Sequence, residues 1–392
     1  MNDGERGAFV PVGYLISVAV IAAGTLCALA PPRRPRPLAE LSFRCGLLLN
    51  EAPVLGGYFL LASTLLVFAQ RDIGSPGAWA VVGAAALTGA GLVAIARRGL
   101  RAAPVLERAL AEGLGPDGRA AAGAGPEGRP RHRRRLARAL FAPVFPRRRD
   151  VERIPNLRYG DAGRRNLLDV YRHRSRPAGG PVLIHLHGGG YRQGRKNTQA
   201  LPLLYRLASR GWVCVSANYR LRPAARHPDH LVDLKQVIAW VRAHGPGYGA
   251  DPSRLVVAGS SAGGHMAALA ALTPNDPVFQ PGFEEADTAV TAAVCLNGYF
   301  GPYYGHGAAS SPAAHVRADA PPFLIVHGDR DTVVPATEAR RFAGTLRAAS
   351  AASVVHAELP GAQHAFDLFP SARFEAVVDA VEVFADRVLK GR

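Results

Sequence analysis

One serine lies in a short glycine-flanked segment, GSSAG at residues 259–263, between an apolar run and a helix of small residues. The apolar run at 255–258 predicts a buried strand, and residues 266–269 belong to the following helix. A G-x-S-x-G sequence between a strand and a helix is typical of a nucleophile elbow, a sharp turn that exposes a serine hydroxyl. Glycines are needed there because the two backbones pass close to the serine. Ser261 is therefore the candidate nucleophile.

Three further segments with polar or glycine residues follow predicted strands. In the first, consecutive glycines allow backbone N–H groups to turn towards an anion, as an oxyanion hole requires. The other two supply an aspartate and then a histidine, so that the order along the chain is Ser, Asp, His. The segments are HGGGY (187–191), HGDRDTVVP (327–335) and GAQHAFD (361–367).

Together these motifs resemble those of α/β-hydrolase esterases. Residues 155–392 are similar to the hormone-sensitive-lipase-like group and to the branch of carboxylesterases, feruloyl esterases and kynurenine formamidases. Many hormone-sensitive-lipase relatives have Asp where this chain has Ser260, which favours the second branch. The resemblance implies serine-dependent hydrolysis by an α/β-hydrolase fold. The matching segments are HGGGY (187–191), SANYRL (216–221), GSSAGGH (259–265), HGDRDTVVP (327–335) and QHAFD (363–367).

A serine hydroxyl needs a base within hydrogen-bonding reach to remove its proton as it attacks. The resemblance assigns this role to His364, which lies in a loop after the acid and the last strand. It assigns Asp331 as the carboxylate that orients the imidazole, with Asp329 as the alternative. Asp367 is expected either to support His364 locally or to be a solvated loop carboxylate.

Backbone N–H groups are expected to hold the tetrahedral oxyanion. The predicted donors are Gly188, Gly189 and Ala262, and the sequence leaves open the pair Gly189 and Gly190 instead. Aromatic residues near and within 297–322 either line an acyl pocket or pack under a loop; the predicted pocket residues are Tyr191, Tyr299 and Phe300. No metal-ligand or phosphate-loop motif occurs, so we expect no metal and no cofactor.

Arginine dominates the charge of this 392-residue chain: 44 of the 47 basic residues are arginine, and the net charge is +17. Residues 97–150 hold 14 arginines against five acidic residues, so the excess is concentrated there. This segment has neither interleaved aromatic residues nor a recognisable nucleic-acid-binding fold, and nucleic acid is not an expected partner. The four cysteines form no C-x-x-C pair and predict neither a zinc site nor a disulfide framework.

Three apolar stretches at the start of the chain predict membrane spans near residues 8–30, 52–70 and 76–96. Each has about the 20 apolar residues that a span needs. An uncleaved helix is expected for the first, because the preceding residues are not basic and proline follows the A-x-A-like site at 28–30. Arginines follow the first and third spans, which predicts a cytoplasmic C-terminal domain and an external N-terminus. If only two of these stretches cross the membrane, both ends of the chain lie on the same side of it.

The chain is thus predicted to have three parts: a transmembrane region (1–96), an arginine-rich linker (97–150) and an α/β-hydrolase domain (151–392). Within the linker, residues 133–141 form either a short amphipathic helix on anionic lipid or a solvated tether. From residue 154 onwards strand and helix patterns alternate, which predicts a mostly parallel sheet flanked by helices.

Three functions fit these patterns. The leading hypothesis is a membrane-anchored serine esterase of the cell membrane, with a small, lipophilic ester as substrate and membrane lipid as its surroundings. The alternative is an amidase such as an arylformamidase, because the same residues serve amides if the leaving nitrogen is protonated. The third is a non-catalytic hydrolase-like scaffold, and the presence of all three candidate catalytic residues argues against it.

Overall fold

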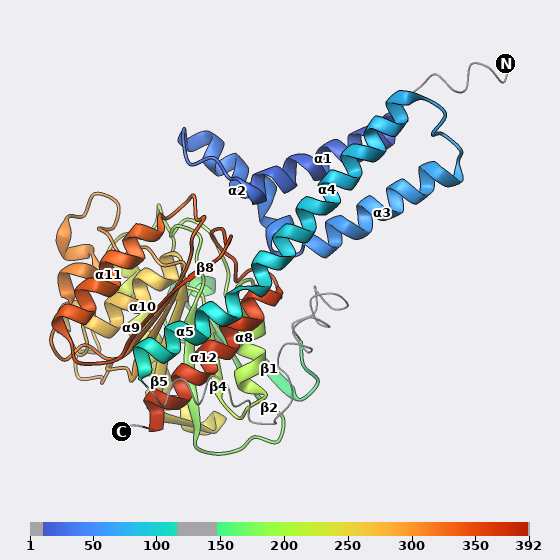
Figure 1. The fold of residues 1–392 in the computed structure, drawn as a ribbon. Helices are drawn as coiled ribbons and strands as arrows, with labels where there is room; N and C mark the ends of the chain where they lie inside the picture. Colours follow the sequence, from blue (N-terminus) through green and yellow to red (C-terminus); the bar gives the residue numbers. More distant parts are fainter. Residues whose placement is uncertain (1–10, 116–146, 391–392) are drawn as a thin grey trace.

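The computed structural model describes residues 11–115 and 147–390, and its C-terminal part is built on one eight-stranded sheet (Figure 1). The strand order is β1-β2-β4-β3-β5-β6-β7-β8. The six strands from β4 to β8 in that order are parallel, and β1 and β2 extend one edge as antiparallel strands. The strands are β1 (Val151–Arg158), β2 (Leu167–His173), β3 (Gly180–Leu186), β4 (Val213–Ala217), β5 (Ala250–Ser260), β6 (Ala292–Leu296), β7 (Phe323–Gly328) and β8 (Val354–Leu359).

Helices cover both faces of this sheet, as expected for strands that are apolar on both sides. One core lies between the sheet and the helices α9 (Asp229–His244), α10 (Ala262–Leu272) and α11 (Ala336–Ala349). The other lies between the sheet and the helices α5 (Ala102–Leu114), α8 (Leu201–Ala208) and α12 (Ala372–Lys390). The predicted mostly parallel, helix-flanked sheet is therefore confirmed.

Four further helices precede α5: α1 (Val12–Leu29), α2 (Arg36–Glu51), α3 (Pro53–Ala69) and α4 (Pro76–Leu100). In Figure 1, α1, α3 and α4 form a bundle that extends away from the sheet, and the α3–α4 connection lies at its far end. Small residues allow α1 and α2 to approach closely: a Cβ atom on Gly46 would lie 3.0 Å from the backbone of Ala28.

Two helical segments, α1 and the segment from Pro76 to Leu114, are each long and apolar enough to cross a membrane. The pair α2 and α3 qualifies only when the two are combined, and it is bent by 85°. Of the three predicted spans, those near 8–30 and 76–96 therefore correspond to α1 and α4. The span predicted near 52–70 corresponds to α3, which has 17 residues.

The structure differs from the sequence prediction in two segments. The segment after α1, expected as a loop, contains the helix α2, to which two of its basic residues, Arg36 and Arg44, belong. Residues 97–114, expected as linker, are helical: α5 packs on β8 and α12 through the buried side chains of Leu106 and Leu110, which are four residues apart and so share one helix face. The predicted amphipathic helix at 133–141 lies outside the described residues.

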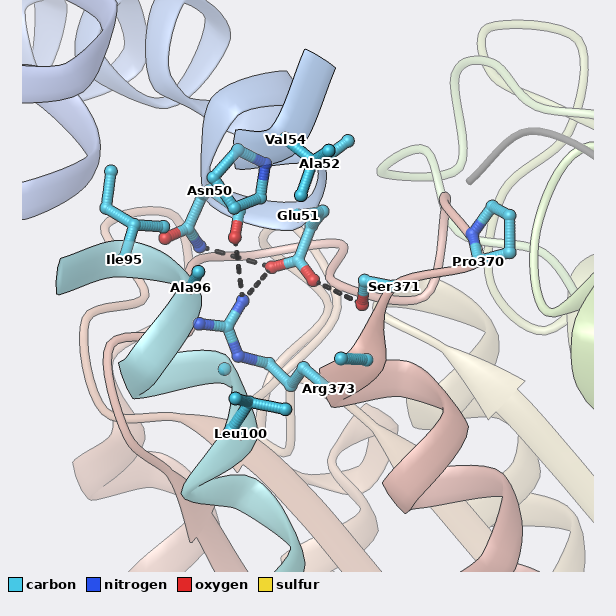
Figure 2. A pocket seen from close by; sticks show the side chains of 13 residues that line it. Asn50, Glu51, Ala52, Val54, Ile95, Ala96, Leu100, Pro370, Ser371 and Arg373 are labelled. Carbon is cyan, nitrogen blue, oxygen red and sulfur yellow. Dashed lines mark hydrogen bonds and ion pairs between the residues drawn. The ribbon is translucent and has the colours of Figure 1, made fainter. Parts of the chain in front are cut away.

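A buried ion pair joins the N-terminal helices to the C-terminal domain, beside a pocket where α2, α3 and α4 meet the start of α12 (Figure 2). The carboxylate of Glu51 accepts hydrogen bonds from the Arg373 guanidinium and from Ser371 Oγ, the latter at 2.7 Å. Asn50 Nδ2 also donates to Glu51, at 3.1 Å. Because every polar group of this carboxylate has a partner, the contact holds the two parts in one relative position.

Two arginines complete this junction at the end of α1. The carbonyl oxygen of Leu29, which has no partner within its own helix, accepts hydrogen bonds from Arg98 Nη1 at 3.0 Å and from Arg330 Nη1 at 2.8 Å. Arg98 belongs to α4 and Arg330 to the C-terminal domain. The last turn of α1 is therefore capped by both parts of the molecule.

Candidate active site

Ser261 lies at the turn between β5 and α10 with φ 53° and ψ −114°, a conformation that side chains rarely adopt. The neighbouring glycines are required by close backbone contacts. A Cβ atom placed on Gly259 would lie 2.1 Å from the carbonyl oxygen of Gly263, and one placed on Gly263 would lie 2.1 Å from that of Leu186. The local backbone is thus the sharp elbow that the sequence predicts, with the serine at its tip.

Ser261, His364 and Asp331 form one hydrogen-bonded chain. His364 Nε2 lies 2.9 Å from Ser261 Oγ, and His364 Nδ1 lies 2.6 Å from Asp331 Oδ2. The three residues follow β5, β8 and β7, which are parallel, so all three lie beyond the carboxyl ends of the strands. The alternative acid, Asp329, instead accepts a hydrogen bond from Gly361 N at 2.7 Å.

The second carboxylate oxygen of Asp331 is held by the backbone. Asp331 Oδ1 accepts hydrogen bonds from Val333 N at 2.8 Å and from Val334 N at 2.7 Å. His327 Nε2 also lies 3.3 Å from Asp331 Oδ2. These contacts fix the plane of the carboxylate, and therefore the orientation of the imidazole that it bonds.

The opposite charges of His364 and Asp331 raise the pKa of the imidazole and lower the pKa of the carboxyl group. Both shifts favour a charged carboxylate beside a histidine that can accept the serine proton. Burial alone would lower the pKa of His364, but the adjacent Asp331 carboxylate outweighs burial and raises it above 6.5. Burial alone would raise the pKa of Asp331, yet the charge of His364 and the hydrogen bonds from His327 and His364 hold it well below its usual range. Asp331 is therefore ionised at neutral pH and stabilises a protonated His364.

The glycine loop after β3 offers backbone donors near the serine, but Gly188 is already engaged. Gly188 N donates to Gln199 Oε1 at 2.5 Å. Gly189 and Gly190 have φ values of 114° and 60°, and in the described part of the chain their N–H groups, and that of Ala262, donate to no protein acceptor. Of the two arrangements that the sequence left open, this geometry favours Gly189, Gly190 and Ala262.

A buried polar network lies directly behind the nucleophile. Ser260 Oγ donates to Asp367, and His185 Nε2 lies 3.1 Å from the same hydroxyl. Asn297 Nδ2 donates to the other Asp367 oxygen at 3.2 Å, while Asn297 Oδ1 accepts from Ala365 N. Burial raises the pKa of Asp367 to about 6 although the Ser260 hydrogen bond opposes this. The network ties the loop that carries His364 to the strand that carries Ser261.

The predicted pocket residues lie in different environments. Tyr191 is buried and its hydroxyl lies 2.7 Å from His265 Nδ1. Phe300 belongs to the hydrophobic core, where its ring stacks on Phe342 at a centroid distance of 4.3 Å, so it is packed away from solvent. Tyr299 is only half-buried and stays a predicted pocket residue.

Two residues at the site were missed by sequence reasoning. Gln199 was not predicted because its contact with Gly188 depends on how the loop folds back. Phe43 of α2 was not predicted because its segment was taken for a basic loop. Its ring meets the His364 ring edge-on, with centroids 6.0 Å apart and an interplanar angle of 71°. The sequence signal for Phe43 was its place in an apolar, helix-forming run.

Within residues 11–115 and 147–390 no group of three or more His, Cys, Asp or Glu side chains is arranged to hold a metal ion. The site instead combines a strained serine, an imidazole in contact with it, a charged carboxylate and unpaired backbone donors. With the sheet order, this arrangement defines the α/β-hydrolases.

Comparison with known proteins identifies the family. The BD-FAE family model matches residues 168–303 and 305–346. LipM of Mycobacterium tuberculosis, named a "probable carboxylic ester hydrolase", is 39% identical over 96% of this chain and 93% of LipM. The esterase LipQ of the same organism is 40% identical over 74% of this chain and 76% of LipQ. The chain belongs to this family of carboxylic ester hydrolases with the α/β-hydrolase fold.

A solved structure agrees with this assignment. Esterase 2 of Thermogutta terrifontis with butyrate bound is 27% identical to this chain, with a TM-score of 0.51. The match covers 62% of this chain and 94% of that structure. The likeness therefore corresponds in extent to the hydrolase domain.

Proposed function

We propose that this chain is a membrane-anchored esterase that hydrolyses carboxylic esters through Ser261, His364 and Asp331. The observation that carries the proposal is the position of His364, within 2.9 Å of Ser261 Oγ and 2.6 Å of Asp331 Oδ2. This is the arrangement in which an imidazole takes the serine proton while a carboxylate keeps it in the required tautomer.

The reaction proceeds in two stages. Ser261 Oγ attacks the ester carbonyl as its proton passes to His364 Nε2, and the C=O electrons move to the carbonyl oxygen. The tetrahedral intermediate collapses, His364 returns the proton to the leaving alcohol, and an acyl-enzyme remains on Ser261. A water molecule, deprotonated by His364, then attacks the acyl carbonyl, and the carboxylic acid leaves as Ser261 recovers its proton.

The oxyanion of both tetrahedral intermediates is assigned to the N–H groups of Gly189, Gly190 and Ala262. Ala262 is the first residue of α10, so its N–H has no partner within the helix, and the helix dipole favours a negative charge there. Loss of one such donor costs on the order of 3 kcal/mol of transition-state stabilisation.

Three transmembrane segments, α1, α3 and α4, are the anchor in this proposal. In Figure 1, α2 and the hydrolase domain lie at one end of the bundle, and the α3–α4 connection lies at the other. This arrangement agrees with three crossings of the membrane. The arginines at 33–44 lie on the side of the hydrolase domain, where Arg33 Nη2 donates to the Asp329 carbonyl at 3.2 Å. The bias of arginine to the cytoplasmic side then places this domain in the cytoplasm.

The substrate class follows from the family and the surroundings. Esterase 2 of T. terrifontis binds butyrate, a short acyl group. The match to LipM covers 96% of this chain, so it includes most of the N-terminal helices. We infer a short or medium acyl ester with a lipophilic part as the substrate.

The decisive experiment compares membranes that contain wild type, Ser261→Ala or Ser253→Ala, the last a control serine exposed on the same strand. We expect wild type and the control to hydrolyse p-nitrophenyl esters from acetate to medium chain lengths and to react with a fluorophosphonate probe. Ser261→Ala should do neither. Equal labelling of Ser261→Ala and wild type would exclude Ser261 as the nucleophile.

Two further arms test the remaining alternatives. Serine-dependent hydrolysis of N-formylkynurenine without ester hydrolysis would establish an amidase. No serine-dependent activity or labelling would favour a scaffold. An alkaline phosphatase fusion at Gly160 should be inactive in a bacterial host, and an active fusion would contradict the cytoplasmic placement.

A further inference from the structure

The helix α2 has an apolar surface that faces away from the protein. Leu38, Leu41 and Leu48 are 48%, 56% and 45% exposed. Cys45 is exposed as well. The spacing of these four residues, three or four apart, places them on one face of the helix. We call this face the leucine strip of α2.

The opposite side of α2 lies against the active site. Phe43 is rotated by about half a turn from the leucine strip, and its ring meets that of His364. One turn earlier, the Ala39 carbonyl accepts a hydrogen bond from Thr332 Oγ1 at 3.3 Å, next to Asp331. One face of α2 therefore contacts the catalytic residues, and the opposite face carries the leucine strip.

The bend at Glu51 sets the direction of α2 relative to the bundle. The axes of α2 and α3 differ by 85°. If α3 crosses the membrane, α2 lies close to parallel with its surface. A helix in that position with exposed leucines on one face and arginines around it has the composition of an interfacial helix.

The charge of the segment fits an anionic lipid surface. Four arginines lie in or just before α2, at positions 33, 34, 36 and 44, against one exposed acid, Glu40. Glu40 pairs with Arg44 at 3.1 Å, which leaves three arginines at the start of the helix. Such a cluster attracts the phosphate groups of anionic phospholipids.

We propose that the leucine strip of α2 rests in the lipid surface and that the esterase takes amphiphilic esters directly from the bilayer, past Phe43. The proposal rests on the proposed function. Phe43 forms an apolar edge beside His364, so the lipophilic part of the substrate contacts its ring while the ester reaches Ser261. The occupant of the strip is phospholipid, because α2 is joined to the proposed transmembrane helix α3 by a single residue and its leucines are flanked by arginine.

The first test uses protein reconstituted in vesicles of phosphatidylcholine and phosphatidylglycerol. We would measure the ratio of two rates in each preparation: hydrolysis of p-nitrophenyl palmitate dissolved in the vesicles and of water-soluble p-nitrophenyl acetate. The triple variant Leu38→Ser, Leu41→Ser, Leu48→Ser should lower this ratio at least about fivefold. The control Val278→Ser, which changes an exposed valine of the hydrolase domain, should leave it unchanged.

The outcomes separate this proposal from the one it rests on. A ratio within twofold of wild type in the triple variant would overturn the role of the strip. A fall in the ratio that accompanies dissociation of an oligomer in detergent would assign the strip to a protein contact and also overturn it. If Ser261→Ala retains both activities, the proposed catalytic function has failed instead.

A second measurement does not depend on activity or on the triple variant. An environment-sensitive fluorophore on Cys45, in a Cys27→Ala background, should be quenched by spin-labelled phospholipid in the vesicles. The same fluorophore on Val278→Cys, with Cys45 also replaced by alanine, should not be quenched. Equal quenching at the two positions would contradict the lipid contact of α2. Phe43→Ala should change the preference between acyl chains more than the rate on acetate.

Discussion

Replacing Glu51, whose carboxylate lies between the N-terminal helices and the hydrolase domain, should lower the free energy of unfolding of the whole chain. The burial and the contacts of Glu51 determine by how much. The side chains of Glu51 and Arg373 are 0% and 1% exposed. In Glu51→Ala the Arg373 guanidinium keeps, among the described residues, two carbonyl acceptors, those of Asn50 at 3.3 Å and Pro360 at 3.4 Å. Breaking a buried ion pair by removing one partner costs about 3–5 kcal/mol. The entropy of unfolding is about 2.1 cal/mol/K per residue, so for the full chain we expect the midpoint of thermal unfolding to fall by about 5 °C.

The assay is thermal unfolding of the full chain in detergent, followed by tryptophan fluorescence. The double variant Glu51→Leu, Arg373→Met should recover most of the loss, because apolar side chains of similar size replace a buried ion pair at little cost. Glu40→Ala removes an exposed pair with Arg44 and serves as the control, with a shift below about 2 °C. Equal midpoints for Glu51→Ala and Glu40→Ala would refute the argument.

Three further predictions concern the active site. Asp331→Asn should lower kcat/KM for p-nitrophenyl acetate by about 10⁴-fold, since the imidazole loses its charged partner; a loss below tenfold would contradict this role. Because the pKa of His364 is raised above 6.5 and its neutral form is the base, the rate should fall as pH drops through a value above 6.5, and this limb should move to lower pH in Asp331→Asn. The pKa of Asp367 is raised from 3.8 to about 6 in the native state, so its protonated form stabilises that state by about 3 kcal/mol below pH 3.8, and this stabilisation is lost as the pH rises through 6. The midpoint of thermal unfolding of Asp367→Asn should therefore depend less on pH between these values than that of wild type. An unchanged pH dependence would refute this role of Asp367.

The parts of the site predictable from sequence were those carried by local patterns. Ser261 was predicted because the elbow needs a strand, two glycines and a helix within a few residues. His364 and Asp331 were assigned by the resemblance to α/β-hydrolase esterases, and each lies in a loop that follows a buried apolar strand. The sheet was predictable for the same reason, since its central strands are apolar without interruption. What these patterns could not supply was the hydrogen bond from Gly188 to Gln199, which depends on the path of the loop.

The N-terminal region was less predictable because its elements pack on partners distant in sequence. The arginines near α2 suggest a loop from sequence alone. The helix packs on α1 through Gly46, and this contact is not apparent from the sequence. The spacing of Leu106 and Leu110 in α5 is typical of a helix. The segment was nevertheless predicted to be a linker because it is rich in arginine. Phe43 is separated from His364 by more than 300 residues, and no local pattern connects them.

The continuity of α4 with α5 has a geometrical consequence. The segment from Pro76 to Leu114 is helical over 39 residues, and its last turns are part of the hydrolase core. At 1.5 Å per residue, such a helix is a stiff rod of nearly 60 Å. In a membrane-anchored esterase this rod would fix the height of the nucleophile above the hydrocarbon. The depth of the ester bond within a lipid would then select substrates, in addition to the size of the acyl group.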